Sequence, residues 1–484
     1  MTIKSNDIIS NFVWRFFERV GAQVVAFVVS IVLARILEPE AYGSVALITV
    51  ITAILQVFVD SGLGNALIQK KDADNIDFST VFWANLFFCV VLYLLLYFAS
   101  PLIGKFYGEE ELVLYIRVLG ITIIISGLKN VQQAYVSRKM LFKKFFFATL
   151  GGTAIAGIIG IIMALTGMGI WALIAQQLIN LTIDTIILWL TVKWRPEPIF
   201  SVQRFKALFS FGWKLLVSAL LETIYTNVRQ LIIGRMYSSS DLAQYNRGRQ
   251  FPYLIIQNVN TSIDSVLLPA MSNEQNDRIK VREMTRKSIK ISTYIMAPLM
   301  IGLIAIGETL VKLILTEKWL PCVLFMRIFC ITFLFYPIHT ANLNAIKALG
   351  RSDLFLKLEI GKKLVGVIAL LSTMWFGVEA MAYSLLFTSV CSQIINSWPN
   401  KKLLKYGYLE QLRDILPGII LAVVMGCFIY PIQWLGLPDI VTLFIQVLSG
   451  GLVYILLSKI FKVDSFEYMI TILKTYAYRR KKNV

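Results

Sequence analysis

Two stretches decide the fold of this chain: ALFSFGWKLLVSALLETIYTNVRQLIIGR at residues 207–235 and LAQYNRGRQFPYLIIQNVNTSIDSVLL at residues 242–268. Both are hydrophobic, yet at helical spacing each carries polar side chains along one face. A charged side chain that faces hydrocarbon costs about 2.5 to 3.5 kcal/mol on insertion scales, so such a face is unfavourable in lipid. The pattern therefore predicts two membrane helices whose polar faces point into protein or into a water-filled cavity.

The same polar design appears in two earlier spans, near residues 12–36 and 41–60. Cations outnumber carboxylates on these four helices, and Arg holds phosphate oxygens with a bidentate fork, so we expect the cavity to take an anion. Interhelical ion pairs with a purely structural role are the alternative explanation. The candidate residues of a substrate cavity are Arg15, Arg19, Gln23, Asp60, Lys214, Glu222, Tyr225, Arg229, Asn246, Arg247, Arg249, Gln250, Gln257 and Asp264.

Two carboxyl groups are candidates for coupling to H⁺ or Na⁺. Glu222 and Asp60 lie within hydrophobic spans, where desolvation favours the neutral form of a carboxyl group. A salt bridge from Glu222 to Arg229 or Arg15 is the alternative. The only histidine, His339, is expected to be a hydrogen-bonded core residue rather than a proton relay. Lys129 is expected to lie at a span end and to extend towards the interface.

The composition excludes a soluble protein. Of the 484 residues, 57% are hydrophobic and 16% are charged, and the mean hydropathy is +0.70, whereas a soluble domain is usually about 45–50% apolar. We expect an all-α polytopic membrane protein. The five cysteines are scattered through hydrophobic runs, which indicates buried free thiols. No cofactor, metal cluster or catalytic site is expected, no nucleic-acid partner is indicated, and no cleaved signal peptide is recognisable.

Apolar runs of about twenty residues predict fourteen transmembrane helices. Their connections alternate: short loops that carry only Arg35, Lys105, Arg235 and Lys318 alternate with strongly basic connections. By the positive-inside rule this asymmetry places both termini in the cytoplasm. The predicted spans lie near residues 12–36, 41–60, 78–99, 112–135, 145–167, 170–192, 207–235, 242–268, 288–315, 321–346, 361–377, 380–397, 414–431 and 436–458.

A weak internal repeat suggests how the chain is divided. Phe12, Trp14 and Arg15 recur as Phe211, Trp213 and Lys214. Because both copies start from the cytoplasm, the repeat predicts two pseudo-symmetric six-helix lobes plus two C-terminal helices. Span five is rich in small residues over 151–163, which predicts close helix packing. The predicted parts are an N-lobe at 1–206, a C-lobe at 207–397, spans thirteen and fourteen at 398–460, and a cytoplasmic amphipathic basic tail at 461–484.

Several stretches together resemble a known family. They include NFVWRFFERVGAQ, ARILEPEAYG, FVDSGLGNALIQKK, STVFWANL, GIWALIAQQL, FSFGWKLL, YNRGRQFP, LTEKWLPC, HTANLNAIKALGRSD and PNKKLLKYGYLEQLRDILP. Over nearly its whole length the chain resembles the Wzx/TuaB-type oligosaccharide flippases of the multidrug/oligosaccharidyl-lipid/polysaccharide exporter superfamily. The resemblance implies a bacterial inner-membrane protein that moves undecaprenyl-diphosphate-linked sugar units from the cytoplasmic to the periplasmic leaflet. It also implies the two-lobed fold.

Alternating access by such a flippase, in the synthesis of O-antigen, capsule or exopolysaccharide, is thus the expected function. A multidrug or organic-cation antiporter of the same fold is the alternative, although a cationic substrate would favour an acidic cavity. A membrane glycosyltransferase or polymerase would need a sizeable outer loop with catalytic acids, whereas the longest outer loop expected here is 101–111. A transporter rather than an enzyme is therefore expected, with the lipid-linked glycan and membrane lipids as partners.

Overall fold

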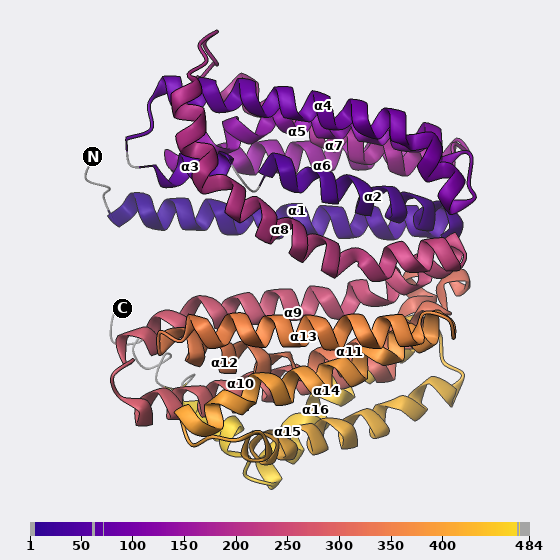
Figure 1. Cartoon of the computed structure of the whole chain (residues 1–484). Helices are drawn as coiled ribbons and strands as arrows, with labels where there is room; N and C mark the ends of the chain where they lie inside the picture. The colour runs from indigo at the N-terminus through magenta and orange to yellow at the C-terminus, as the bar shows by residue number, and fades with distance from the viewer. Residues whose placement is uncertain (1–4, 61–62, 71, 472–473, 475–484) are drawn as a thin grey trace. The chain divides into compact units, whose positions relative to one another are not determined.

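The computed structural model describes residues 5–60, 63–70, 72–471 and 474, with side chains from residue 20 onward except at 65 and 211. The described chain is helical and contains no β-strand (Figure 1). Its elements are α1 (Ser5–Ile36), α2 (Pro39–Asp60), α3 (Leu63–Gln69), α4 (Asn75–Tyr107), α5 (Leu112–Arg138), α6 (Phe142–Leu165), α7 (Ile170–Thr191), α8 (Val202–Met236), α9 (Ser239–Asn273), α10 (Arg278–Leu315), η1 (Glu317–Trp319), α11 (Cys322–Leu334), α12 (Tyr336–Ala348), α13 (Ser352–Thr373), α14 (Val378–Leu403), α15 (Tyr408–Ile429), η2 (Tyr430–Leu435) and α16 (Asp439–Ile460).

The protein is a multi-pass membrane protein. Within the described residues, ten helices are long and apolar enough to cross a bilayer, and α8, bent by 47° near residue 211, would be an eleventh. The three remaining predicted spans coincide with α1, α9 and α13. Polar residues keep α9 and α13 below the hydropathy of an ordinary span, and α1 shows a short apolar part over Val20–Ile36. The count of fourteen stays a prediction.

The chain forms two compact units, Met1–Ala243 and Gln244–Val484. In the first unit α8 packs against α2, α3 and α4, and α9 begins in this unit and continues into the second. The lobe boundaries at 206/207 and 397/398 follow from the sequence repeat and not from packing, and they stay predictions.

Of the predicted basic tail, residues 464–471 are helical, whereas Arg479, Arg480, Lys481 and Lys482 lie outside the described residues.

Small residues bring the helices of the first unit close together. A Cβ at Gly152 of α6 would lie 2.8 Å from the carbonyl oxygen of Asn180 on α7, and one at Gly157 would lie 2.5 Å from Cγ2 of Val29 on α1. Neither contact leaves room for a side chain. The close packing predicted for span five is therefore confirmed.

In the second unit, the predicted span 321–346 is two helices, α11 and α12. Phe335 separates them, with a backbone near φ −92° and ψ 2°, and Pro337 stands in the first turn of α12. Proline lacks an N–H group and cannot continue a preceding helix, whereas it is well suited to a first turn. The prediction of one continuous helix was wrong at this break, although the proline marks it.

The cysteine prediction holds for three residues of five. Cys89, Cys322 and Cys330 are buried free thiols. Cys391 is half-buried, and Cys427 is exposed on α15. In a membrane helix an exposed thiol faces lipid, where a small apolar side chain is tolerated.

Candidate functional site

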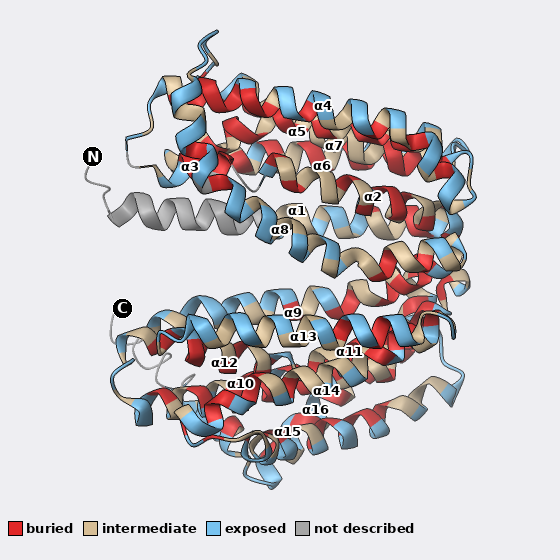
Figure 2. Cartoon of the chain, viewed as in Figure 1, coloured by how far each residue is buried: buried red, intermediate tan, exposed pale blue. Residues whose placement is uncertain are grey.

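Helix α8 is anchored at its two ends and exposed between them. Leu208 is buried near its start and Ile233 near its end, whereas Lys214 and Glu222 are exposed in the middle, as Figure 2 shows for that part of the helix. Tyr225 is half-buried, and Arg229 is buried where the helix packs again. The first unit thus leaves the middle of the polar face of α8 open to a ligand.

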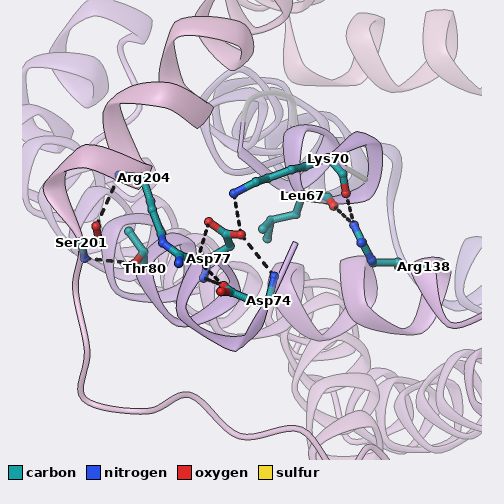
Figure 3. A network of polar contacts seen from close by, with 8 residues as sticks. All are labelled: Leu67, Lys70, Asp74, Asp77, Thr80, Arg138, Ser201 and Arg204. Atoms are coloured by element: carbon teal, nitrogen blue, oxygen red, sulfur yellow. Dashed lines mark hydrogen bonds and ion pairs between the residues drawn. The ribbon is translucent and has the colours of Figure 1, made fainter. Parts of the chain in front are cut away.

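The start of α8 is held by a network of ion pairs and hydrogen bonds with α3 and α4 (Figure 3). Asp77 is fully buried, and its carboxylate lies 2.6 Å from Nζ of Lys70 and 3.3 Å from the guanidinium of Arg204. Asp74 caps α4 by accepting the N–H of Asp77, and it also pairs with Arg204. These contacts hold the first turn of α8 against the start of α4.

Hydrogen bonds from Arg204 and from the backbone N–H of Asp77 lower the pKa of the Asp74 carboxyl to about 2. A carboxyl whose pKa is lowered by folding stabilises the fold at any pH above its ordinary pKa and loses that contribution as the pH falls towards the lowered value. Asp74 therefore stays charged at neutral pH. Arg138 completes it from α5 by donating to the carbonyl oxygen of Leu67 at 2.8 Å.

Helix α9 has a buried first part and an exposed second part. In the first part, a Cβ at Gly248 would lie 2.6 Å from the carbonyl oxygen of Cys322, so α9 and α11 are in close contact there. In the second part Gln257 and Asp264 are exposed. Asp264 accepts a hydrogen bond of 2.6 Å from Nδ2 of Asn344 on α12.

Arg247 and Arg249 have different environments although they are two residues apart. Arg247 is buried, its guanidinium lies 4.9 Å from the ring centroid of Trp319, and it donates a hydrogen bond of 2.6 Å to Gln250. Arg249 is half-buried, and its guanidinium lies 5.1 Å from the ring centroid of Tyr253. Arg247 is therefore held in place by the protein, whereas Arg249 keeps its donors for a ligand.

The remaining candidates divide into three groups. Asn246 and Gln23 are half-buried. Asp60, at the end of α2, accepts hydrogen bonds from Asn130 at 3.0 Å and from Gln56 at 3.3 Å. The side chains of Arg15 and Arg19 lie outside the described residues. The structure thus brings Asp60 together with Asn130, a partner that the sequence analysis did not name.

A second polar contact in the first unit corrects an interpretation made from the sequence. Lys129 was expected to extend towards the membrane interface, but its ammonium group forms an ion pair of 2.6 Å with Asp184 of α7, and both side chains are largely buried. The interpretation was wrong because a cation near a span end can equally meet a carboxylate on a neighbouring helix.

Helix α12 presents polar side chains to two different neighbours. Asn344 and Thr340 bond to α9, through Asp264 and Asn260. On another face Asn342 is completely buried, donating to Gln411 at 2.8 Å, and it accepts from Asn400 at 2.7 Å. Such an amide cluster fixes the packing of α12 against α14 and α15, because each buried amide would lose its partners if the helices moved apart.

His339 lies on the same helix. Its Nδ1 is 3.0 Å from Nδ2 of Asn396 on α14. This contact confirms the expected hydrogen bond, and the residue is half-buried.

The chain is similar to proteins of polysaccharide biosynthesis. A family model described as "Polysaccharide biosynthesis protein" matches residues 32–324. The teichuronic acid biosynthesis protein TuaB of Bacillus subtilis (strain 168) is 25% identical over 414 residues, which cover 84% of this chain and 86% of that protein. The lipopolysaccharide biosynthesis protein WzxC of Escherichia coli (strain K12) is 23% identical over 338 residues, covering 68% of each chain.

Two solved structures show the same fold. The lipid II flippase MurJ, in an inward closed conformation, superposes with a TM-score of 0.74 at 17% identity, covering 94% of this chain and 99% of that one. An inward-facing multidrug resistance transporter of the MATE family gives a TM-score of 0.62 at 15% identity, covering 79% of this chain and 94% of that one. At such low identity these likenesses establish the fold alone.

Proposed function

The chain belongs to the polysaccharide biosynthesis protein family, and from that premise we propose that it is a flippase for undecaprenyl-diphosphate-linked oligosaccharides. Its product would enter O-antigen, capsule or exopolysaccharide synthesis on the far side of the bacterial inner membrane. The observation that carries the proposal is Lys214, which is exposed in the middle of α8 and has no carboxylate partner among the described residues. A cation in a membrane helix without a protein partner is suited to an anionic substrate.

In the proposed mechanism Lys214 of the first unit binds the diphosphate, and Arg249 of the second unit is a separate candidate for the same role. The half-buried Tyr225 and the exposed Gln257 offer hydrogen bonds to sugar hydroxyl groups. The polyprenyl chain stays in the bilayer while the cavity alternates between the two sides of the membrane. Arg247 is proposed as a positioning residue, because it is buried between Gln250 and Trp319.

Coupling to H⁺ or Na⁺ is proposed to use Asp60 and Glu222. Asp60 accepts hydrogen bonds from two side-chain amides, those of Gln56 and Asn130, which form a polar site within the first unit. Glu222 is exposed on the same helix as Lys214. A carboxylate that gains a proton or a sodium ion would change the net charge beside the diphosphate, and so would link ion binding to substrate release.

An organic-cation antiporter is the second candidate, because the MATE fold is shared. The charges make it less favourable, because the exposed Lys214 and the half-buried Arg249 would repel an organic cation.

We further propose that the protein is a transporter without catalytic activity, with fourteen transmembrane helices and both termini in the cytoplasm.

The function is tested by reconstitution. Proteoliposomes that contain the purified protein should move a fluorescent polyprenyl-diphosphate disaccharide to the opposite leaflet, whereas liposomes without it should not. In cells, deletion should leave lipid-linked repeat units on the cytoplasmic leaflet and remove the surface polysaccharide. Undiminished surface polysaccharide after deletion, in a strain without a second transporter of this family, would disprove the assignment.

The topology makes a separate prediction. In a variant without the five native cysteines, single cysteines at the exposed positions Glu110 and Glu379 should react with an impermeant thiol reagent added outside intact spheroplasts. Cysteines at the exposed positions Gln275 and Lys401 should react only after the membrane is opened. The reverse pattern would overturn the orientation.

A further inference from the structure

A cavity of about 1060 Å³ lies in the second unit between the first part of α10, the first part of α15 and the end of α16. This volume is at the upper end of the range for small-molecule sites. None of the described residues that line it comes from α8 or α9, the helices that carry most of the proposed substrate residues. The cavity is thus a separate site.

On all three helices, the residues that line the cavity are charged at the same end of the cavity and apolar at the other end. On α10, Arg286 and Lys290 are followed by Tyr294, and on α15 the charged residues around Arg413 are followed by Leu421 and Val424. Helix α16 runs the other way: Leu457 lies near its end, and Lys462 follows that end. One end of the cavity is therefore charged and the other is apolar, and several of its apolar side chains, such as Val424 at 47%, are exposed where the helix faces lipid.

The charged end contains more cations than the protein neutralises. Five cations and three carboxylates line the cavity. Arg286 pairs with Asp414 at 2.6 Å, Lys290 with Asp464 at 2.7 Å, and Arg282 with Glu410 at 3.6 Å. Among the described residues, Arg413 and Lys462 have no such partner. These two cations at the mouth of the cavity are therefore available to contact an anion from outside the protein.

We propose that this cavity binds an anionic glycerophospholipid of the leaflet at its charged end. The phosphate would accept hydrogen bonds from Arg413 and Lys462, and the acyl chains would lie along Leu421, Val424 and Leu457. A basic pocket between transmembrane helices, with apolar walls below it, matches the division of such a lipid into headgroup and tails. With the proposed orientation, the leaflet is the cytoplasmic one.

The bound lipid would join the last two helices to α10. It would add to the links that the protein already makes there. Besides the three ion pairs, the hydroxyl group of Tyr294 donates to Ser458 at 2.6 Å, and that of Tyr454 donates to the carbonyl oxygen of Tyr294 at 2.9 Å. A ligand that binds only the folded state raises its stability. The site therefore makes the stability of the protein depend on anionic lipid, whichever substrate is transported.

The test measures lipid retention and the melting temperature of the purified full-length protein in detergent. Native mass spectrometry should show phosphatidylglycerol retained in preference to phosphatidylcholine, together with a higher Tm. The double variant Arg413→Gln/Lys462→Gln should lower phosphatidylglycerol retention about tenfold or more, because two charge-assisted contacts to the phosphate are lost. Val424→Trp, which fills the apolar end and keeps every charge, should lower retention as well.

The matched control is Lys401→Gln/Lys402→Gln, which removes the same charge from exposed positions at the end of α14, outside the cavity. It should retain phosphatidylglycerol like the unmodified protein. Equal losses in the control and the site variant would show non-specific attraction, and unchanged retention in both site variants would show that the lipid binds elsewhere. Protection by soluble glycerol phosphate alone, or preferential retention of polyprenyl diphosphate, would also overturn the assignment to a phospholipid.

Discussion

Replacing Lys214 with Ala should weaken binding of a water-soluble diphosphate-sugar analogue about ten- to a hundredfold. A charge-assisted hydrogen bond contributes roughly 1.5 to 3 kcal/mol, and every 1.4 kcal/mol corresponds to a factor of ten in Kd. Arg249→Ala should have an effect of the same size. Arg249→Lys should recover only part of the loss, since the charge remains but the bidentate fork does not.

The control for Lys214 is Lys206→Ala, because Lys206 is exposed on the same helix but lies in its first part, before the buried Leu208. Its Kd should be unchanged. Titration calorimetry gives the affinities, and the Tm of each variant shows whether the fold is intact. Variants of Lys214 and Arg249 that melt early but bind normally would assign these cations a structural role and refute the proposed cavity.

Gly43→Ala should destabilise the protein more than other glycine substitutions. A Cβ at Gly43 of α2 would lie 1.7 Å from the carbonyl oxygen of Ser239, the first residue of α9. Backbone atoms cannot move aside as a flexible side chain can, so the two helix starts must separate. The hydrogen bonds of Ser44 and Ser239 to Glu109 would then be lost as well. We expect a loss of about 3 kcal/mol, at the upper end of the range for overpacking.

The matched control for this prediction is Gly451→Ala. Gly451 lies inside α16, and a Cβ there would have no heavy atom within 4 Å. Alanine favours a helix over glycine by about 1 kcal/mol, so this variant should be as stable as the unmodified protein or slightly more stable. Tryptophan fluorescence during heating compares the two variants. If Gly43→Ala melts like the unmodified protein, the close contact between α2 and α9 does not exist in solution.

Some features of the site could be predicted because they depend on neighbouring residues along one helix. The polar faces of α8 and α9 follow from helical spacing, and the structure shows Lys214, Glu222, Gln257 and Asp264 as exposed members of them. The close packing around Gly152 was predicted from a run of small residues in the same way. The pattern did not separate Arg247 from Arg249, because burial of Arg247 depends on Trp319, seventy-two positions further along the chain.

The sequence by itself determined that this protein is an all-helical membrane protein with cation-rich polar helices, because the cost of placing a polar group in hydrocarbon acts on each segment separately. The tertiary structure alone decided which polar groups meet. Lys129 pairs with Asp184, Asp60 accepts from Asn130, and Asn342 joins Gln411. Each pair unites helices that are distant in sequence, and its geometry depends on how their side chains interlock, which no local pattern of residues records.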